Sequence, residues 1–331
     1  MIKLAIAGAG YIANIHAAAI KNNPDTELSV IVDKFPDKAQ AFAKKFGIKH
    51  QFDTVERMLE NVGVDALVIG TPNYLHAPQT IAALNAGIHV MVEKPMAMNA
   101  SEAQHMLEAS HKSGALLMVA HCWRFDPEVL WLREQVISAR FGSIIRTKGY
   151  GVHALWGPSG WFTQQEFAGG GAMADVGIHA LDTARFLLGD PQPESVYARI
   201  GTYYTDYDVD DTGLLIVNWE GGAVSYIESG WWQPHTDGQE AATQLYGTKA
   251  FGQLFPTFIQ EQNKKLDPGF AFPRKEHCPQ SLYDDQMSYF FQCIRDHHTP
   301  TPGGIEGWIN MKVIDAAYKS AQTGTVVEVE K

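Results

Sequence analysis

Three side chains that could exchange a proton with a hydroxyl group stand in two separate motifs. Lys94 lies in Glu93-Lys94-Pro95, and Asp175 and His179 stand four positions apart in a stretch that begins with three consecutive glycines. Oxidation of an alcohol needs a base for the hydroxyl proton while hydride leaves the carbon. A lysine, together with a histidine supported by a carboxylate, can supply that base. These motifs therefore predict acid–base chemistry on a hydroxyl compound.

Each motif also fits a structural role. By position alone, Lys94 also fits a surface lysine in a turn. Asp175 and His179 are expected on one face of a helix, where such a pair also fits capping or packing. The same pair would give a metal two ligands, but no third ligand stands at a convincing spacing, so we predict no metal site.

A glycine-rich turn, Gly8-Ala9-Gly10-Tyr11-Ile12-Ala13, directly follows an apolar strand pattern and opens a helical one. Gly8 permits the tight turn, and Gly10 lets the backbone approach a pyrophosphate. The helix that begins here offers free N–H groups and its positive dipole end to the phosphates. The turn therefore predicts a dinucleotide site that includes Tyr11 and Ile12.

Asp33 ends the second strand pattern, about 20 residues after the turn, where an acidic side chain binds the ribose hydroxyls of NAD. Its charge would repel the 2′-phosphate of NADP, so NAD is the expected cofactor. Lys34, the next residue, is a cation that tolerates this phosphate, which leaves NADP possible. Asp33 also fits a turn-capping residue before Pro36.

The first 121 residues alternate short apolar runs with helical patterns. The runs are nearly all apolar, as expected for parallel strands covered on both faces. They occupy residues 2–7, 28–32, 66–69, 88–92 and 115–120. We predict a doubly wound Rossmann domain over 1–121. Ligands bind beyond the carboxyl ends of such strands, where the loops holding Asn73 and Lys94 should border one crevice.

From residue 122 onward the pattern changes to longer runs in which apolar and polar residues alternate. Such runs are typical of an antiparallel sheet with one open face, and they occupy residues 195–204, 213–219, 223–231 and 241–246. Residues 256–280 are polar and rich in Pro and Gly and predict a loop. We predict an α/β protein whose second domain, 122–331, is α+β with a large open, mostly antiparallel sheet. Residues from about 300 to 331 are candidates for packing back on the N-terminal domain.

The motifs together resemble a known family. They are Gly8-Ala9-Gly10, Thr71-Pro72-Asn73-x-x-His76, Glu93-Lys94-Pro95, Arg124-Phe125-x-Pro127 and Asp175-x-Gly177-x-His179. In this order and spacing they look like the Gfo/Idh/MocA family of glucose–fructose oxidoreductase and inositol dehydrogenase. The resemblance implies an NAD(P)-dependent dehydrogenase that acts on a CH–OH group of a carbohydrate or polyol. It also implies a homodimer or homotetramer formed through the C-terminal sheet.

By matching position, the resemblance implies Lys94 and His179 as the acid–base groups at the reacting carbon. It implies that Asp175 binds substrate hydroxyls or supports Lys94. Tyr283 resembles a family position that reaches the substrate. The residues implied on the nicotinamide side are Thr71, Pro72, Asn73, His76 and Glu93.

Several further side chains could contact a substrate. Trp156 and Trp161 lie in a Gly/Pro-rich stretch that we expect to overhang the crevice, and aromatic faces stack well on the C–H faces of sugars. His153 and Arg124 could add hydrogen bonds. Tryptophans also fill cores and interfaces, so both also fit a packing role.

Composition excludes several function classes. The net charge of -11, with no basic stripe, disfavours binding to nucleic acid or an anionic membrane. No apolar run reaches the roughly 18 residues that span a bilayer, and the N-terminus lacks a signal-peptide pattern. Three cysteines without metal or CxxC spacing fit a reducing compartment, so we expect a cytoplasmic protein.

Two other functions remain open on this fold. One is a sugar hydrolase or epimerase that retains its cofactor and oxidises the substrate only transiently. The other is a non-catalytic NAD-sensing regulator, which the intact Lys94, Asp175 and His179 disfavour.

Overall fold

The computed structural model describes residues 1–236 and 238–330, and it contains two compact units. Unit 1 comprises residues 1–122 and 278–308, and unit 2 comprises residues 123–277 with the chain from Ile309 onward. This division differs from the expected one because residues 278–308 belong to unit 1, and of the stretch from about 300 onward only the part up to Trp308 belongs to that unit. Contacts distant in sequence explain this, since the helix over Gln280–Asp296 packs on the helix over Tyr11–Lys21.

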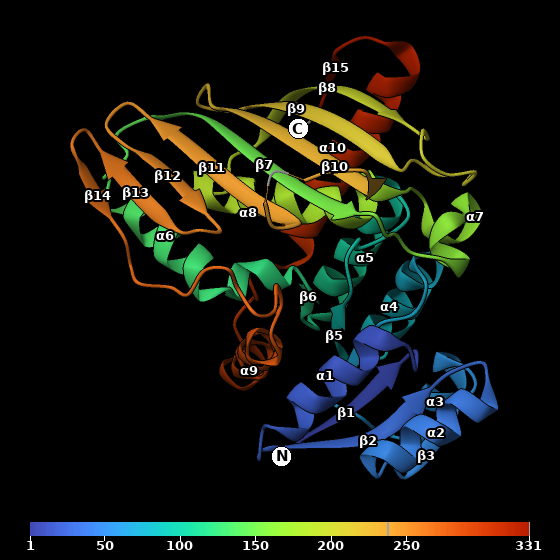
Figure 1. Ribbon diagram of the computed structural model, residues 1–331. Helices are drawn as coiled ribbons and strands as arrows, with labels where there is room; N and C mark the ends of the chain where they lie inside the picture. The colour runs from blue at the N-terminus through green and yellow to red at the C-terminus, as the bar shows by residue number, and fades with distance from the viewer. Residues whose placement is uncertain (237, 331) are drawn as a thin grey trace. The chain divides into compact units, whose positions relative to one another are not determined.

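Unit 1 is built on a six-stranded sheet in the order β3-β2-β1-β4-β5-β6, with every strand pair parallel (Figure 1). The strands are β1 (Ile2–Ala7), β2 (Thr26–Val32), β3 (His50–Phe52), β4 (Ala66–Ile69), β5 (His89–Val92) and β6 (Leu117–Val119). The helices are α1 (Tyr11–Lys21), α2 (Pro36–Phe46), α3 (Val55–Asn61), η1 (Asn73–Leu75), α4 (His76–Asn85), α5 (Ala100–Ser113) and α9 (Gln280–Asp296). This strand order is that of a Rossmann sheet, and the predicted fold is confirmed.

The apolar runs of unit 1 form strands because both faces of the sheet are covered. All four residues of β4 are buried, and four of the six residues of β1 are fully inaccessible to solvent. Ile69, the last residue of β4, pairs with Val92, the last residue of β5, so the two strands end at the same edge of the sheet. The loops that follow these two strands therefore start side by side.

Unit 2 is built on a nine-stranded sheet in the order β14-β13-β12-β11-β7-β10-β9-β8-β15 (Figure 1). Its strands are β7 (Ile144–Ala154), β8 (Pro193–Gly201), β9 (Thr212–Trp219), β10 (Val224–Gln233), β11 (Ala241–Gly247), β12 (Phe251–Leu254), β13 (Phe258–Glu261), β14 (Lys264–Leu266) and β15 (Val327–Glu328). All pairs are antiparallel except β7 with β10. The predicted mostly antiparallel sheet is confirmed.

Helical segments of unit 2 pack against one face of this sheet. The helical elements are η2 (Cys122–Phe125), α6 (Pro127–Ile137), η3 (Gly160–Thr163), α7 (Gln165–Ala168), the π-helical η4 (Met173–Gly177), α8 (Ile178–Leu188) and α10 (Gly304–Thr323), which begins in unit 1. A side chain at Gly149 would lie 3.6 Å from Ala180 of α8, and one at Gly151 would lie 2.8 Å from Val176. The odd-numbered positions of β7 thus point toward the helices, and Lys148 and Tyr150 point toward the opposite face.

The expected loop over 256–280 contains a short hairpin, which is a correction. Strands β13 and β14 occupy its first part because Ile259 is fully buried in a core cluster with Phe141, Leu245 and Leu254. Apolar residues do not alternate regularly with polar ones here, since Phe258 and Ile259 are adjacent and mostly polar residues follow them. Residues 267–279 form no helix or strand, as predicted.

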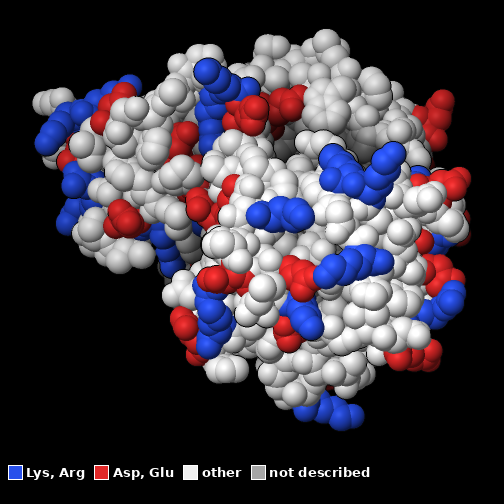
Figure 2. All heavy atoms as spheres, turned by 90° about the horizontal axis from the view of Figure 1, so that it is seen from below, with Lys and Arg blue, Asp and Glu red and all other residues white. Residues whose placement is uncertain are grey.

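The face shown in Figure 2 carries both positive and negative side chains, with Lys and Arg interspersed among Asp and Glu. This face therefore lacks the continuous basic stripe that a nucleic acid would require. Among the described helices, none is long and apolar enough to cross a membrane.

Candidate dinucleotide and substrate sites

The glycine-rich turn between β1 and α1 has the geometry of a phosphate cradle. Gly8 has φ +92°, and a Cβ there would lie 2.6 Å from the carbonyl oxygen of Gly70, so no other residue fits without a backbone shift. A Cβ at Gly10 would meet no atom within 4 Å. Helix α1 starts at Tyr11 without a side-chain cap, which leaves its first N–H groups available to a phosphate.

We therefore expect Gly10→Ala to weaken NAD binding at least about tenfold, because the new methyl group would occupy the space where a pyrophosphate approaches. The melting temperature should not change, since Gly10 has an ordinary φ of -83° and free space around it. Fluorescence titration with NADH and a thermal melt measure the two effects. Gly8→Ala is the contrasting variant and should lower the melting temperature. Unchanged NADH affinity in Gly10→Ala would place the dinucleotide elsewhere.

Asp33 lies at the end of β2 and is fixed beside this turn. One carboxylate oxygen accepts a hydrogen bond from the backbone N–H of Ala9 at 2.8 Å, and the other accepts from Phe35 at 2.9 Å. Remaining lone pairs can accept from ribose hydroxyls. Lys34 is exposed, and its ammonium group lies 5.1 Å from the Phe35 ring centre. The turn, the helix start and this carboxylate together fit a dinucleotide.

His76 ties together the two loops that follow β4 and β5. Its Nδ1 lies 2.8 Å from the carbonyl oxygen of Pro95, and its Nε2 lies 2.9 Å from that of Thr71. The ring is 1% exposed, and burial lowers its pKa although both carbonyl contacts oppose the shift. A neutral ring donates to one of these carbonyls. His76 is therefore a buried residue that connects the Thr71-Pro72-Asn73 loop to the loop that follows β5.

A buried histidine that sequence reasoning missed supports the loop of Lys94. His16 on α1 is fully buried, and its Nε2 lies 2.7 Å from Oε1 of Glu93. The other oxygen of Glu93 accepts from the backbone N–H of Lys94 at 3.2 Å. Burial alone would raise the pKa of Glu93, but the hydrogen bond and charge of His16 and the charge of Lys94 bring it below its ordinary value. Glu93 is therefore held as a carboxylate inside unit 1.

Tyr283 belongs to this same cluster of unit 1. It is 7% exposed, and its ring meets His16 edge-on at a centroid distance of 5.9 Å. Burial, followed by the neighbouring thiols of Cys122 and Cys278, raises its pKa far above the usual range. The spacing Ala13, His16, Ala17, Ile20 on one face of α1 was the available sign that His16 is internal.

Asp175 and His179 lie in unit 2 on a helix of unusual geometry. Asp175 is in the π-helical turn of η4, and His179 is in the first turn of α8. Both residues are therefore helical, as expected, but Asp175 lies in a π-turn, and π-turns of this kind occur often at functional sites. The imidazole of His179 stacks on the indole of Trp123, with centroids 4.9 Å apart and planes 17° apart.

Asp210, which the sequence did not single out, anchors the start of this helix. Its carboxylate accepts from the backbone N–H groups of Gly171 and Met173, each at 2.8 Å, and from the hydroxyl of Tyr318 at 2.7 Å. A Cβ at Gly171 would lie 1.9 Å from the backbone oxygen of Asp210. Close packing against Asp210 therefore requires glycine at position 171, four residues before Asp175 in the chain.

Arg124 is placed in the interior of unit 2, not at a surface that could meet substrate. Its guanidinium donates to both carboxylate oxygens of Asp182, at 2.7 and 2.8 Å, and to Asp190 at 2.9 Å. The residue is only 3% exposed. These bidentate ion pairs give Arg124 a structural role, and we remove it from the candidate substrate contacts.

The remaining aromatic candidates form stacked pairs at the end of β7 and in the segment that follows it. His153 stacks on Trp156 with centroids 3.6 Å apart, and Trp161 stacks on Phe162 at 3.8 Å. The indole N–H of Trp156 donates to Glu240. Trp156 is 46% exposed, so its ring has surface left to offer a ligand.

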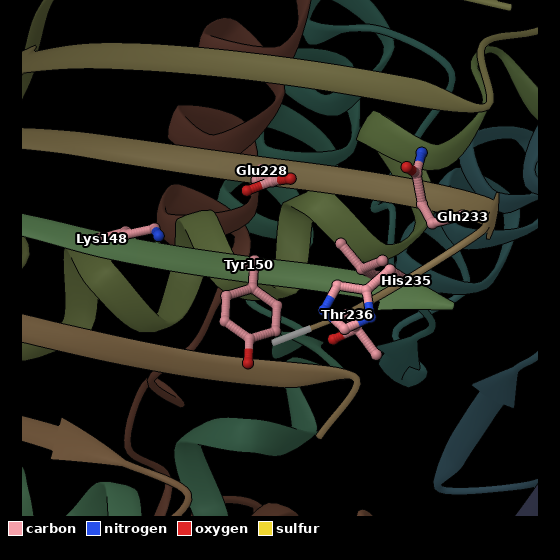
Figure 3. Close-up of a pocket in the computed structure, with 7 residues that line it drawn as sticks. Lys148, Tyr150, Glu228, Gln233, His235 and Thr236 are labelled. Carbon is pink, nitrogen blue, oxygen red and sulfur yellow. The ribbon is translucent and has the colours of Figure 1, made fainter. Parts of the chain in front are cut away.

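A separate hollow of about 170 Å³ lies on the opposite face of the unit 2 sheet. Figure 3 shows Lys148 and Tyr150 of β7 beside Glu228 of β10. Val152, Gln233, His235 and Thr236 complete its lining. It contains none of the predicted catalytic residues. Within residues 1–236 and 238–330, no group of three or more His, Cys, Asp or Glu side chains is placed to hold a metal ion.

Comparison with known proteins yields matches to both halves of the chain. A family model described as an oxidoreductase family with an NAD-binding Rossmann fold matches residues 2–121, and the GFO/IDH/MocA C-terminal domain model matches residues 129–251.

Individual proteins match over nearly the whole length. D-glucoside 3-dehydrogenase of Escherichia coli K12 is 31% identical, over 99% of this chain and 97% of its own. The NAD(+)-dependent scyllo-inositol 2-dehydrogenase of Bacillus subtilis 168 is 26% identical, over 99% and 96%. The crystal structure of aldose-aldose oxidoreductase from Caulobacter crescentus superposes with a TM-score of 0.86 and 26% identity, covering 99% of both chains.

Proposed function

Because this chain belongs to the GFO/IDH/MocA family of NAD-binding oxidoreductases, we propose that it is an NAD(P)-dependent dehydrogenase that oxidises a CH–OH group of a carbohydrate or polyol. The observation that carries the proposal is the full-length match to D-glucoside 3-dehydrogenase, because it runs through both units. Intact Lys94, Asp175 and His179 support an enzyme over a regulator.

The residues that would hold the dinucleotide belong to unit 1. The N–H groups at the start of α1 would bind the pyrophosphate, and Asp33 would accept from the adenosine ribose. Thr71, Pro72 and Asn73 would lie toward the nicotinamide. When bound, the nicotinamide supplies the acceptor for the hydride.

Lys94 and His179 would supply the proton chemistry. Lys94 stands two residues after the end of β5, with its backbone N–H bonded to Glu93, which pairs with His16. It would accept the hydroxyl proton of the reacting carbon. His179, held against Trp123, would serve as the second acid–base group, and Asp175 would bind substrate hydroxyls or support Lys94. Trp156 and Trp161 would stack on the sugar and exclude water.

The proposal is tested by mixing purified protein with NAD and a panel of sugars, glycosides and inositols, and following the near-ultraviolet absorbance of reduced nicotinamide. Accumulation over many turnovers with one compound class is expected. The absence of reduced cofactor with every compound, despite NAD binding, would contradict it.

A second mode of reaction, in which the substrate is oxidised only transiently, is favoured by the likeness to an aldose-aldose oxidoreductase, whose name pairs two aldoses in one oxidoreduction. In that mode the cofactor stays bound and returns to its starting state. The absorbance signal would then stop at the enzyme concentration, and cofactor would be present in the purified protein.

We expect NAD to bind at least about tenfold more tightly than NADP, because the carboxylate of Asp33 would face the 2′-phosphate. Titration with NADH and NADPH measures the ratio. Asp33→Asn removes the charge but keeps a hydrogen-bond acceptor. It should bring the dissociation constants for NADH and NADPH closer together. A dissociation constant for NADP at or below that for NAD would overturn this preference.

We further propose that the protein forms a homodimer or homotetramer through the open face of the unit 2 sheet. By the strand register, one row of half-buried side chains crosses this face. The row consists of Tyr197, Ile216, Tyr226, Lys148, Gln244, Gln253 and Phe258. The hollow of Figure 3 lies on the same face and includes Lys148. Four of these seven side chains are aromatic or aliphatic, and aromatic residues are enriched at subunit contacts.

Ile216→Glu is expected to convert the assembly to monomers, because it places a charge in this row where a partner would bury it. Light scattering measures the mass. Leu130→Glu makes the same kind of change at a 42% exposed position of α6 and should leave the mass unaltered. A monomeric wild-type protein would contradict the assembly. We also propose a cytoplasmic location, since none of the three cysteines stands at CxxC or metal-ligand spacing in the sequence.

A further inference from the structure

A loop of unit 2 that ends at His277 is fixed to the body of that unit. The guanidinium of Arg274 donates to Asp126 at 2.7 Å and lies 3.3 Å from Glu128. It also stacks 4.5 Å from the centre of the Phe255 ring. The three charged side chains are at most 10% exposed. Partly buried ion pairs with such geometry hold a loop in one place, so His277, three residues further on, is fixed in position.

The imidazole of His277 is packed between two aromatic rings. It meets Trp123 edge-on at a centroid distance of 4.9 Å and Phe255 at 5.5 Å. Trp123 is the same indole on which His179 stacks. One tryptophan therefore contacts both the proposed acid–base histidine and His277.

Both ring nitrogens of His277 are buried and have no hydrogen-bond partner among the described residues. Burial, then the positive charge of Arg274 and the neighbouring His153, lowers its pKa to about 4. The ring is therefore neutral at physiological pH, with one N–H donor and one acceptor. A buried polar group without a hydrogen bond is destabilising, and a ligand that forms hydrogen bonds with these nitrogens would remove that cost.

We propose that His277 is a substrate-binding residue that holds a hydroxyl group of the sugar or polyol beside Trp123. A hydroxyl both donates and accepts, as does a neutral imidazole, whereas a carboxylate or phosphate would find only one donor there. This inference rests on the proposed function. It adds a determinant of which hydroxyl pattern the enzyme accepts.

The test is His277→Phe, which keeps an aromatic ring against Trp123 and Phe255 but removes both nitrogens. We expect KM for the sugar to rise at least about tenfold, the size of one or two lost hydrogen bonds, with kcat changed less than KM. The dissociation constant for NADH should stay the same. His277→Asn, a smaller side chain that keeps a donor and an acceptor, should recover part of the lost kcat/KM.

Singly deoxygenated substrates identify the contact. For one hydroxyl position, its removal should reduce kcat/KM in the wild type but not further in His277→Phe, because the same hydrogen bond is already absent. His111→Phe, the same replacement on the exposed end of α5, is the control and should behave as wild type. If His277→Phe does not melt cooperatively, wild type and His277→Asn are compared on the same deoxygenated substrates, and that comparison tests the role of His277.

The outcomes separate the two proposals. An active wild type with unchanged KM in His277→Phe, or equal losses for every deoxygenated substrate in both proteins, would overturn the role of His277 and leave the dehydrogenase in place. A wild type that oxidises no sugar or polyol would overturn the proposed function and this inference together.

Discussion

Replacement of Lys94 by alanine is expected to reduce kcat by at least about a hundredfold, the lower end of what a positioned acid–base group contributes. The change removes the ammonium group but not the backbone N–H that is bonded to Glu93, so the loop should keep its conformation. Steady-state turnover with saturating NAD and sugar measures the loss. A thermal melt and NADH titration should match the wild type.

Lys112→Ala, at the exposed end of α5, is the matched control and should turn over normally. Near-normal turnover in Lys94→Ala would remove this lysine from the mechanism. The surface-lysine interpretation of its motif would then be the correct one.

Replacement of His179 by phenylalanine is expected to have an effect of the same order, about a hundredfold or more on kcat. Phenylalanine keeps a ring to stack on Trp123, which separates the loss of the imidazole from a loss of packing. Stopped-flow measurement of a single turnover should show that the chemical step is slowed. A variant within about threefold of wild type would leave His179 with a packing role only, well below acid–base magnitudes.

The double variant Lys94→Ala/His179→Phe tests whether these two side chains act in the same reaction step. Residues that act together in one step are strongly non-additive, so the double variant should lose little more than the worse single variant. Losses that multiply would instead assign the two side chains to independent effects.

The Rossmann half was predictable because its signals are local. Gly8 and Gly10 stand in one turn, and the apolar strand runs are short, continuous and bounded by turn residues. The alternating runs of the second half likewise predicted strands. The hairpin at Phe258–Glu261 was missed because only one of its side chains is fully buried.

The candidate site was less predictable because its supports are distant in sequence. His16 meets Glu93 across 77 residues, and Arg124 meets Asp182 across 58. The sequence motifs include Glu93 and Arg124, but they do not show which side chain forms a hydrogen bond with each of them. The π-turn at Asp175 depends on Gly171 packing on Asp210, which is likewise a tertiary contact.

Hydride transfer itself is measured most directly with a substrate that carries deuterium on the carbon of each hydroxyl group. After reaction with NAD, the reduced nicotinamide is isolated and its mass and proton spectrum are recorded. We predict one deuterium on the nicotinamide ring and a slower turnover than with unlabelled substrate. Reduced nicotinamide without deuterium, or label found only in water, would contradict oxidation of a CH–OH group by this protein.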